Sequence, residues 1–236
     1  RDLVLDEVIG IVGMKSGDVI FANNIYLPDV PIIKELKRSD DDVWVAFTSD
    51  VHVGSNNFLE REFVEFINWI NGQYPKKYPD IKIKYLFFLG DLVDGVGIYP
   101  NQEKNLTIMD VTSQYNALAN YLAKIRGDVN IIMCAGNHDA VRISQPQPQL
   151  EKKYAKSLYE LKNIAIVTNP SIVNIHASKT FSGFNVLMFH GNSFHYYLEN
   201  VDSLVSSGAR DNPRHIMKFL LQRRHLAPTH ASTLYI

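Results

Sequence analysis

The sequence predicts an α/β fold, in which strands and helices alternate along the chain. Four short apolar runs are typical of buried strands and occupy residues 43–49, 84–89, 130–134 and 184–189. Two amphipathic stretches lie between the first three runs and predict helices over residues 58–71 and 112–126. Each run ends in polar side chains, and open α/β sheets bind ligands at the carboxyl ends of their strands. The fold class therefore also predicts where a functional site lies.

The composition excludes several classes of protein. The 236 residues can form one good core, or one domain and part of another. A hydrophobic content of 46% with 21% charged residues fits a folded globular protein rather than a disordered one. The net charge of -1 argues against a strongly basic nucleic-acid binder, although a local basic patch stays open. The only cysteine, Cys134, excludes an internal disulfide and favours the cytoplasm. No apolar run has the roughly 18 residues of a membrane helix.

Residues 1–42 precede the first buried strand and carry a different pattern. Apolar residues alternate weakly over residues 2–30, which predicts a β-hairpin, and a polar stretch follows. We expect residues 1–42 to be the end of a preceding β domain with a linker, and residues 43–236 to form the main domain. An extra edge hairpin of the main domain is the alternative. Since residues 233–236 resemble the inside of a strand, we expect the main domain to be truncated at Ile236.

Capping residues set the expected helix ends. Asn57 is placed to cap the first helix with Glu60 reaching back, and Gly72 is placed to end it. Gly127 is placed to stop the second helix. The later elements are expected as a helix at 150–161, short strands at 164–167 and 172–175, and a helix from Asn212-Pro213 to about 224.

Side chains that bind metals follow the apolar runs. The turn at residues 135–139 follows the third run and presents Asn137, His138 and Asp139 together. The other runs end in similar residues, and the candidate metal ligands are Asp50, His52, Asp91, Asn137 and His190. Taken singly, each is an ordinary turn residue. Taken together and in order, they predict a metal site.

The ligand types indicate the chemistry of this site. Carboxylate, imidazole and amide donors without a thiolate suit Mn²⁺, Fe²⁺ or Zn²⁺, and argue against structural zinc. Ligands from several strands favour two metals, as used for displacement at phosphorus. His138 is placed to protonate a leaving oxygen, with a role as a hydrogen-bonding neighbour of a ligand as the alternative. Asp94 is expected to orient a ligand, and Asp139 either does the same or closes its turn.

The four motifs resemble, in order, those of the calcineurin-like metallophosphoesterase superfamily: Asp50-Val51-His52, Gly90-Asp91-Leu92-Val93-Asp94, Gly136-Asn137-His138-Asp139 and His190-Gly191. That resemblance implies a β-sandwich flanked by helices. Residues 90–103, 136–149 and 224–229 further resemble the small subunits of archaeal family-D DNA polymerases. This narrower resemblance implies that residues 1–42 end an OB-fold-like domain.

The resemblance also implies roles for individual residues. Asp50 and His52 would bind one metal and Asp91 would bridge both; the second metal would take Asn137 and His190, with His138 as general acid. The implied activity is 3′–5′ exonuclease proofreading with two divalent ions, Mn²⁺ above all. The implied partners are a large polymerase subunit, DNA 3′ ends and the sliding clamp, in an archaeal cytoplasm.

One superfamily motif is missing. Gly-His-x-His does not occur before Ile236, and the surroundings of His230 do not match it. We expect this motif downstream of Ile236; an incomplete site is the alternative. A generic phosphoesterase and a non-catalytic scaffold subunit are the alternative functions.

Overall fold

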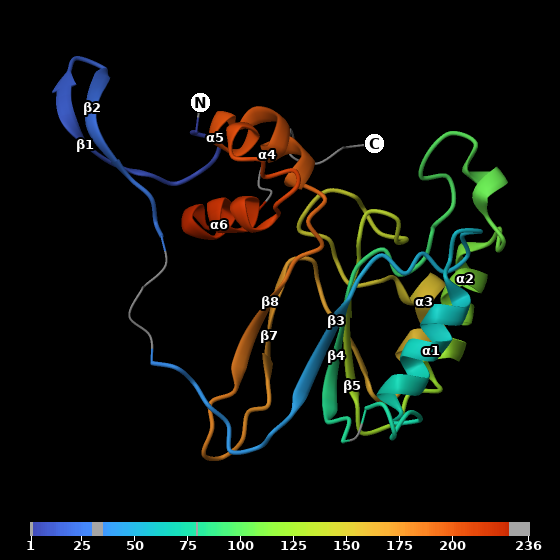
Figure 1. Ribbon diagram of the computed structural model, residues 1–236. Helices are drawn as coiled ribbons and strands as arrows, with labels where there is room; N and C mark the ends of the chain where they lie inside the picture. Colours follow the sequence, from blue (N-terminus) through green and yellow to red (C-terminus); the bar gives the residue numbers. More distant parts are fainter. Residues whose placement is uncertain (1, 30–34, 79, 227–236) are drawn as a thin grey trace. The chain divides into compact units, whose positions relative to one another are not determined.

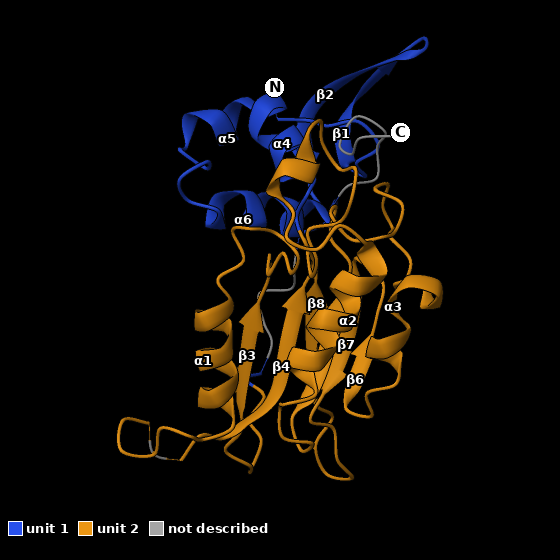
Figure 2. Ribbon diagram, turned by 90° about the vertical axis from the view of Figure 1, so that its right-hand side faces the viewer, with its two compact units in different colours: residues 1–36, 191–236 blue, residues 37–190 orange. Residues whose placement is uncertain are grey.

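The computed structural model describes residues 2–29, 35–78 and 80–226. The chain divides into two compact units, residues 37–190 and residues 1–36 together with 191–236 (Figure 2). The predicted strand ending at 233–236 lies outside the described residues.

The larger unit is built on a four-stranded parallel sheet. Its strands run in the order β3 (Trp44–Thr48), β4 (Ile83–Leu89), β5 (Asn130–Cys134) and β6 (Ile164–Ile166). Helices α1 (Glu60–Ile70), α2 (Val111–Leu122) and α3 (Lys152–Tyr159) lie along one face of the sheet (Figure 1). Side chains alternate across a strand, so Leu86 and Phe88 of β4 face this helical layer and are completely buried. Burial of such side chains is the main stabilising contribution of the sheet.

A second sheet covers the opposite face. Strands β7 (Ser171–Ile175) and β8 (Phe184–Met188) form an antiparallel pair. A separate core joins the two sheets, made by Phe87, Ile132, Cys134, Ile175 and Met188. The predicted α/β class, with a β-sandwich flanked by helices, is confirmed.

The fourth apolar run departs from the expectation of one common sheet edge. It forms β8 and pairs only with β7, within the part of the chain that the structure describes. The physical reason is its alternating burial, with Met188 inside and Leu187 exposed, which is typical of a strand with one solvated face. His190 therefore reaches the candidate site from the second sheet.

The helix ends correct two details of the sequence analysis. The cap residue of α1 is Leu59 and no side chain caps the helix, so the prediction of an Asn57 cap is wrong. Glu60 instead accepts a hydrogen bond from the Tyr121 hydroxyl, which joins α1 to α2. Gly72, with φ of 75°, follows the last turn of α1 as predicted. Helix α2 is capped by Asp110 and ends at Leu122, short of the predicted 126.

Among its described residues, the smaller unit contains the predicted hairpin and three helices. The hairpin is formed by β1 (Gly10–Ser16) and β2 (Val19–Tyr26). Helix α6 (Arg214–Arg223) was predicted, although Pro213 takes the cap position and no side chain caps it. Helices α4 (Phe194–Asn200) and α5 (Asp202–Ser206) were not, because seven and five residues are too few for a clear helical period. The OB-fold origin of the hairpin and the domain boundary at residue 42 stay predictions.

None of the described helices is long and apolar enough to cross a membrane.

Candidate metal centre

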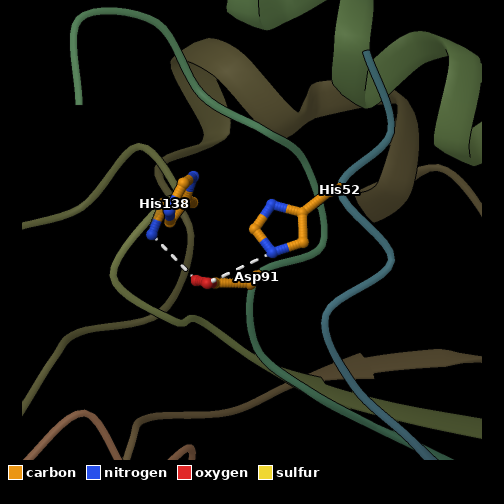
Figure 3. A group of neighbouring side chains, drawn as sticks. All are labelled: His52, Asp91 and His138. Atoms are coloured by element: carbon orange, nitrogen blue, oxygen red, sulfur yellow. Dashed lines mark hydrogen bonds and ion pairs between the residues drawn. The ribbon is translucent and has the colours of Figure 1, made fainter. Parts of the chain in front are cut away.

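The predicted residues converge at the ends of the strands of the larger unit. Two groups of potential ligand atoms, each within 4.8 Å, share the Asp91 carboxylate. One group is His52, Asp91 and His138, drawn in Figure 3, where both histidines lie beside the carboxylate. The other is Asp50, Asp91 and His190. Asn137 joins the second group, because its Oδ1 lies 3.0 Å from His190 Nε2. Five residues from three other motifs thus meet around the Asp91 carboxylate.

The backbone at these positions is strained. Asp50, His52 and Asp91 have φ of 55°, 50° and 49°, in the left-handed region that non-glycine residues rarely adopt. Each such residue costs about 1–3 kcal/mol and persists where its surroundings fix it. The Asp50 N–H donates to the Gly90 carbonyl and the His52 N–H to the Asp91 carbonyl, both at 3.1 Å. These bonds hold the loops after β3 and β4 together and direct both sets of side chains to one place.

Two glycines allow the loops to approach. A Cβ at Gly136 would lie 2.2 Å from Asp91 Oδ1 and 2.4 Å from its backbone nitrogen. A Cβ at Gly90 would lie 2.6 Å from His190 Nδ1 and 2.8 Å from the Gly136 Cα. Any larger residue would therefore displace the Asp91 carboxylate or the His190 ring.

Two histidines are oriented through their Nδ1 atoms. His190 Nδ1 donates a hydrogen bond to the Leu89 carbonyl at 2.7 Å. His190 Nε2 lies 3.5 Å from the Asp91 carboxylate. His52 Nδ1 lies 3.1 Å from Asp94 Oδ1, and its Nε2 lies 3.6 Å from Asp91. In metal sites, a hydrogen bond on one ring nitrogen presents the other to the ion. Both rings have that arrangement, so the donor set fits a divalent cation.

His138 is held at two points. Its backbone N–H donates to Asp91 Oδ1 at 2.8 Å, and its ring Nδ1 lies 2.8 Å from the Asp94 carbonyl. The carbonyl keeps the proton on Nδ1 and leaves Nε2 for a substrate or a cation. The ring packs edge-on against His52, with 4.6 Å between centroids. This geometry suits a general acid and equally a ligand.

Asp139 closes its turn and ties the turn to its neighbours. Its buried carboxylate accepts hydrogen bonds from the Gly136 N–H at 2.8 Å, the Leu92 N–H at 3.3 Å and the Tyr115 hydroxyl at 3.0 Å. Burial, together with the charge of Asp91, raises the pKa of Asp139 to about 6 against these bonds. Asp139 therefore fixes the loop after β5 to the loop after β4 and to α2.

Asp91 and His190 form a coupled pair. Burial alone would raise the pKa of Asp91, but the hydrogen bond and charge of His190 and the His138 N–H outweigh it and lower the pKa. Burial opposes a charge on His190, yet the Asp91 carboxylate outweighs burial and raises the pKa of His190 to about 9. Without a metal, His190 therefore holds a proton beside an ionised Asp91. A cation would take the place of that proton, because imidazole must be neutral to act as a ligand.

Buried amides support the centre, and sequence reasoning missed them. Gln102 donates to Asp94 Oδ2 at 2.8 Å and to its carbonyl at 2.9 Å. Gln147 donates to the Gly136 carbonyl at 2.9 Å and accepts from Asn169 at 2.6 Å, and Asn169 accepts from the His190 N–H at 3.0 Å. A glutamine in a polar loop gives no signal of burial, so nothing in the sequence marks these residues.

A centre of carboxylate, amide and imidazole donors at the ends of the strands, on a helix-flanked sandwich, is typical of metal-dependent phosphoesterases. The profile of the calcineurin-like phosphoesterase family matches residues 43–234, and the chain belongs to that family.

Curated relatives are more specific in name. This chain is 43% identical to the DNA polymerase II small subunit of Methanothermobacter thermautotrophicus, over 96% of this chain and 45% of the relative. It is 43% identical to the protein of that name from Methanocaldococcus jannaschii, over 97% of this chain and 37% of the relative. It is 41% identical to the protein of that name from Archaeoglobus fulgidus, over 97% of this chain and 45% of the relative. The chain spans less than half the length of these relatives. The resemblance to polymerase small subunits is confirmed.

Proposed function

We propose that this chain is the nuclease part of a DNA polymerase small subunit, which hydrolyses the 3′-terminal phosphodiester of DNA. The observation that carries the proposal is the Asp91 carboxylate, shared by two ligand groups that contain His52 and His190 with oriented rings. The name of the relatives supplies the link to DNA. That name does not state an exonuclease activity or the roles of individual residues, and both are part of this proposal.

Five residues would hold two divalent ions: Asp50, His52, Asp91, Asn137 and His190. Neither ligand group contains a cysteine, and the mixed oxygen and nitrogen set favours Mn²⁺, with Fe²⁺ or Zn²⁺ as alternatives. When bound, such ions acidify water and offset the negative charge of the phosphate.

The chain's own residues would complete the reaction. Hydrolysis joins the oxygen of water to phosphorus and breaks the bond to the 3′ oxygen of the preceding nucleotide. That leaving oxygen needs a proton, and the doubly protonated His138 ring would donate it from Nε2 and end as the neutral ring whose Nδ1–H stays bonded to the Asp94 carbonyl. The products are a nucleoside 5′-monophosphate and a strand with a new 3′ hydroxyl.

The proposed role implies partners. A small subunit works with a large catalytic subunit, which would supply the newly made 3′ ends, and a sliding clamp is a further candidate. Work on DNA in an archaeal cell would place the protein in the cytoplasm.

The test measures degradation of a 3′-recessed primer by the full-length protein with Mn²⁺. Asp91→Asn and His138→Ala should abolish cleavage while leaving binding to the large subunit intact. Asp128→Asn is the matched control, because Asp128 is exposed and pairs only with Arg126 among the ion pairs described. Equal cleavage by wild type and both variants would favour the scaffold alternative. Cleavage of a small chromogenic phosphodiester that single-stranded DNA does not inhibit would favour a generic phosphoesterase.

A further inference from the structure

A pocket of about 550 Å³ opens directly beside the candidate centre. Its lining includes Asp50, His52 and Asp94. The lining also includes five aromatic residues: Phe47, Phe58, Phe63, Phe66 and Tyr99. The volume is in the range of small-ligand sites, which are largely apolar with a few polar groups.

The phenylalanine residues of the lining belong to two packing groups, one on each face of the sheet. Phe58, Phe63 and Phe66 pack on one another, with 5.7 Å between the first two centroids and 6.4 Å between the last two. Phe47 stacks on the buried Phe87 at 5.0 Å but is itself 56% exposed. Tyr99 is 40% exposed, and its ring centroid lies 6.4 Å from that of His138. Phe47 and Tyr99 are therefore the two exposed rings of the lining that a ligand could stack on.

The charges of the pocket limit what it can hold. Its lining includes the carboxylates of Asp50, Glu62 and Asp94, and no Lys or Arg occurs among the described lining residues. Away from the ions that Asp50 and His52 would hold, a second phosphate would meet carboxylates and no basic side chain among the described lining residues. A planar, uncharged group with N–H donors would stack on the rings and donate to carboxylates or to Asn57. A nucleobase has those properties.

We propose that this pocket receives the unpaired 3′-terminal nucleobase of the DNA, an inference that rests on the proposed nuclease function. The terminal base is one sugar away from the phosphate that is cut, and the pocket shares Asp50 and His52 with the centre where that phosphate would lie. A base can enter only after it leaves the duplex, and unpairing costs least at a mismatched or single-stranded end. The pocket thus selects the ends that proofreading must remove.

The test compares two single-stranded oligonucleotides that differ only in whether the 3′-terminal nucleotide carries a thymine or is abasic. Stacking on an aromatic side chain contributes enough for a roughly 10-fold preference of the full-length wild-type protein for the thymine end, in kcat/KM with Mn²⁺. Phe47→Ala should remove most of that preference by slowing cleavage of the thymine end alone. Phe47→Tyr keeps a ring and should keep the preference.

A second variant tests the pocket without removing a packed ring, so that its effect does not depend on a loss of folding. Leu59 lines the pocket and is 68% exposed, so Leu59→Trp should block the pocket without disturbing the core. It should slow cleavage of the thymine end and leave the abasic end unchanged. Tyr74→Ala is the control, since Tyr74 is 38% exposed and lies outside the lining.

The outcomes separate the two proposals. If wild type cuts both ends equally, or if Leu59→Trp slows both equally, the base pocket is wrong and the nuclease proposal stands. If neither end is cut, the nuclease proposal itself fails.

Discussion

The Asp94 carboxylate contacts His52 Nδ1 at 3.1 Å, and the Asp94 carbonyl lies 2.8 Å from His138 Nδ1. One buried residue therefore orients a candidate ligand with its side chain and a candidate general acid with its backbone. Substitution of the side chain removes only the first of these contacts, which makes the two functions separable.

Asp94→Ala should weaken metal binding, because it removes the carboxylate beside His52. It should leave the hydrogen bond to the His138 ring in place, because that bond comes from the Asp94 backbone carbonyl. Loss of a hydrogen-bonded partner of a ligand costs about 10- to 100-fold in metal affinity. Isothermal titration of the metal-free full-length protein with Mn²⁺ measures this change. Asp128→Asn should bind as wild type does. Unchanged affinity in Asp94→Ala would show that His52 does not depend on this carboxylate, or is not a ligand.

Gly136→Ala should disrupt the centre, whereas Gly127→Ala should not. A methyl group at residue 136 would lie 2.2 Å from Asp91 Oδ1 and 2.4 Å from a backbone nitrogen that cannot easily move. A methyl group at residue 127 meets nothing within 4 Å. Overpacking of this kind costs about 1–3 kcal/mol. Urea unfolding and Mn²⁺ titration should show lower stability and weaker metal binding for Gly136→Ala than for Gly127→Ala. Equal stability and equal metal affinity in the two variants would contradict the close approach of the loops.

Asn169→Leu should destabilise the larger unit. Asn169 donates to Gln147 Oε1 and accepts from the His190 N–H, and it is completely buried. Leucine would leave both partners unsatisfied, at about 1–3 kcal/mol for each buried group. Asn130→Ala is the control, because Asn130 is exposed. A change in the free energy of unfolding no larger than that of the control would argue against the amide bridge.

His225 should make the stability of the smaller unit depend on pH. Its Nε2–H donates to the Leu5 carbonyl at 3.1 Å, and its Nδ1 accepts from the Tyr197 hydroxyl at 2.7 Å. Burial lowers the pKa of His225 below its ordinary value, against the effect of the Leu5 carbonyl and nearby acids. The unfolded state then binds more protons below the ordinary pKa, so stability present above that pH is lost as the pH falls.

The measurement is urea unfolding at about pH 7 and about pH 5, the range in which histidine titrates. His225→Gln lacks the titrating group, so wild type should lose more stability over this range than the variant. Parallel losses in both proteins would show that His225 does not titrate differently in the folded state.

Much of the fold could be predicted from the sequence, because apolar runs and the polar residues that follow them are local signals. Apolar runs gave β3, β4 and β5, and the polar residues directly after them gave the positions of Asp50, Asp91 and Asn137. The pairing of β8 with β7 is a long-range choice between two sheets, which a run of apolar residues does not specify.

The missed parts of the centre have a common cause. Gln102, Gln147 and Asn169 act through contacts with residues 8 to 22 positions away, so their roles exist only in the folded chain. The predicted cap of α1 is wrong for a related reason. Glu60 accepts a hydrogen bond from Tyr121 on another helix instead of bonding within its own turn.

Since Asp91 belongs to both candidate ligand groups, two ions bound there would not bind independently. An ion in one would reorganise a donor that the other also requires, so their occupancies would be linked thermodynamically. That coupling has the same magnitude whichever ion arrives first.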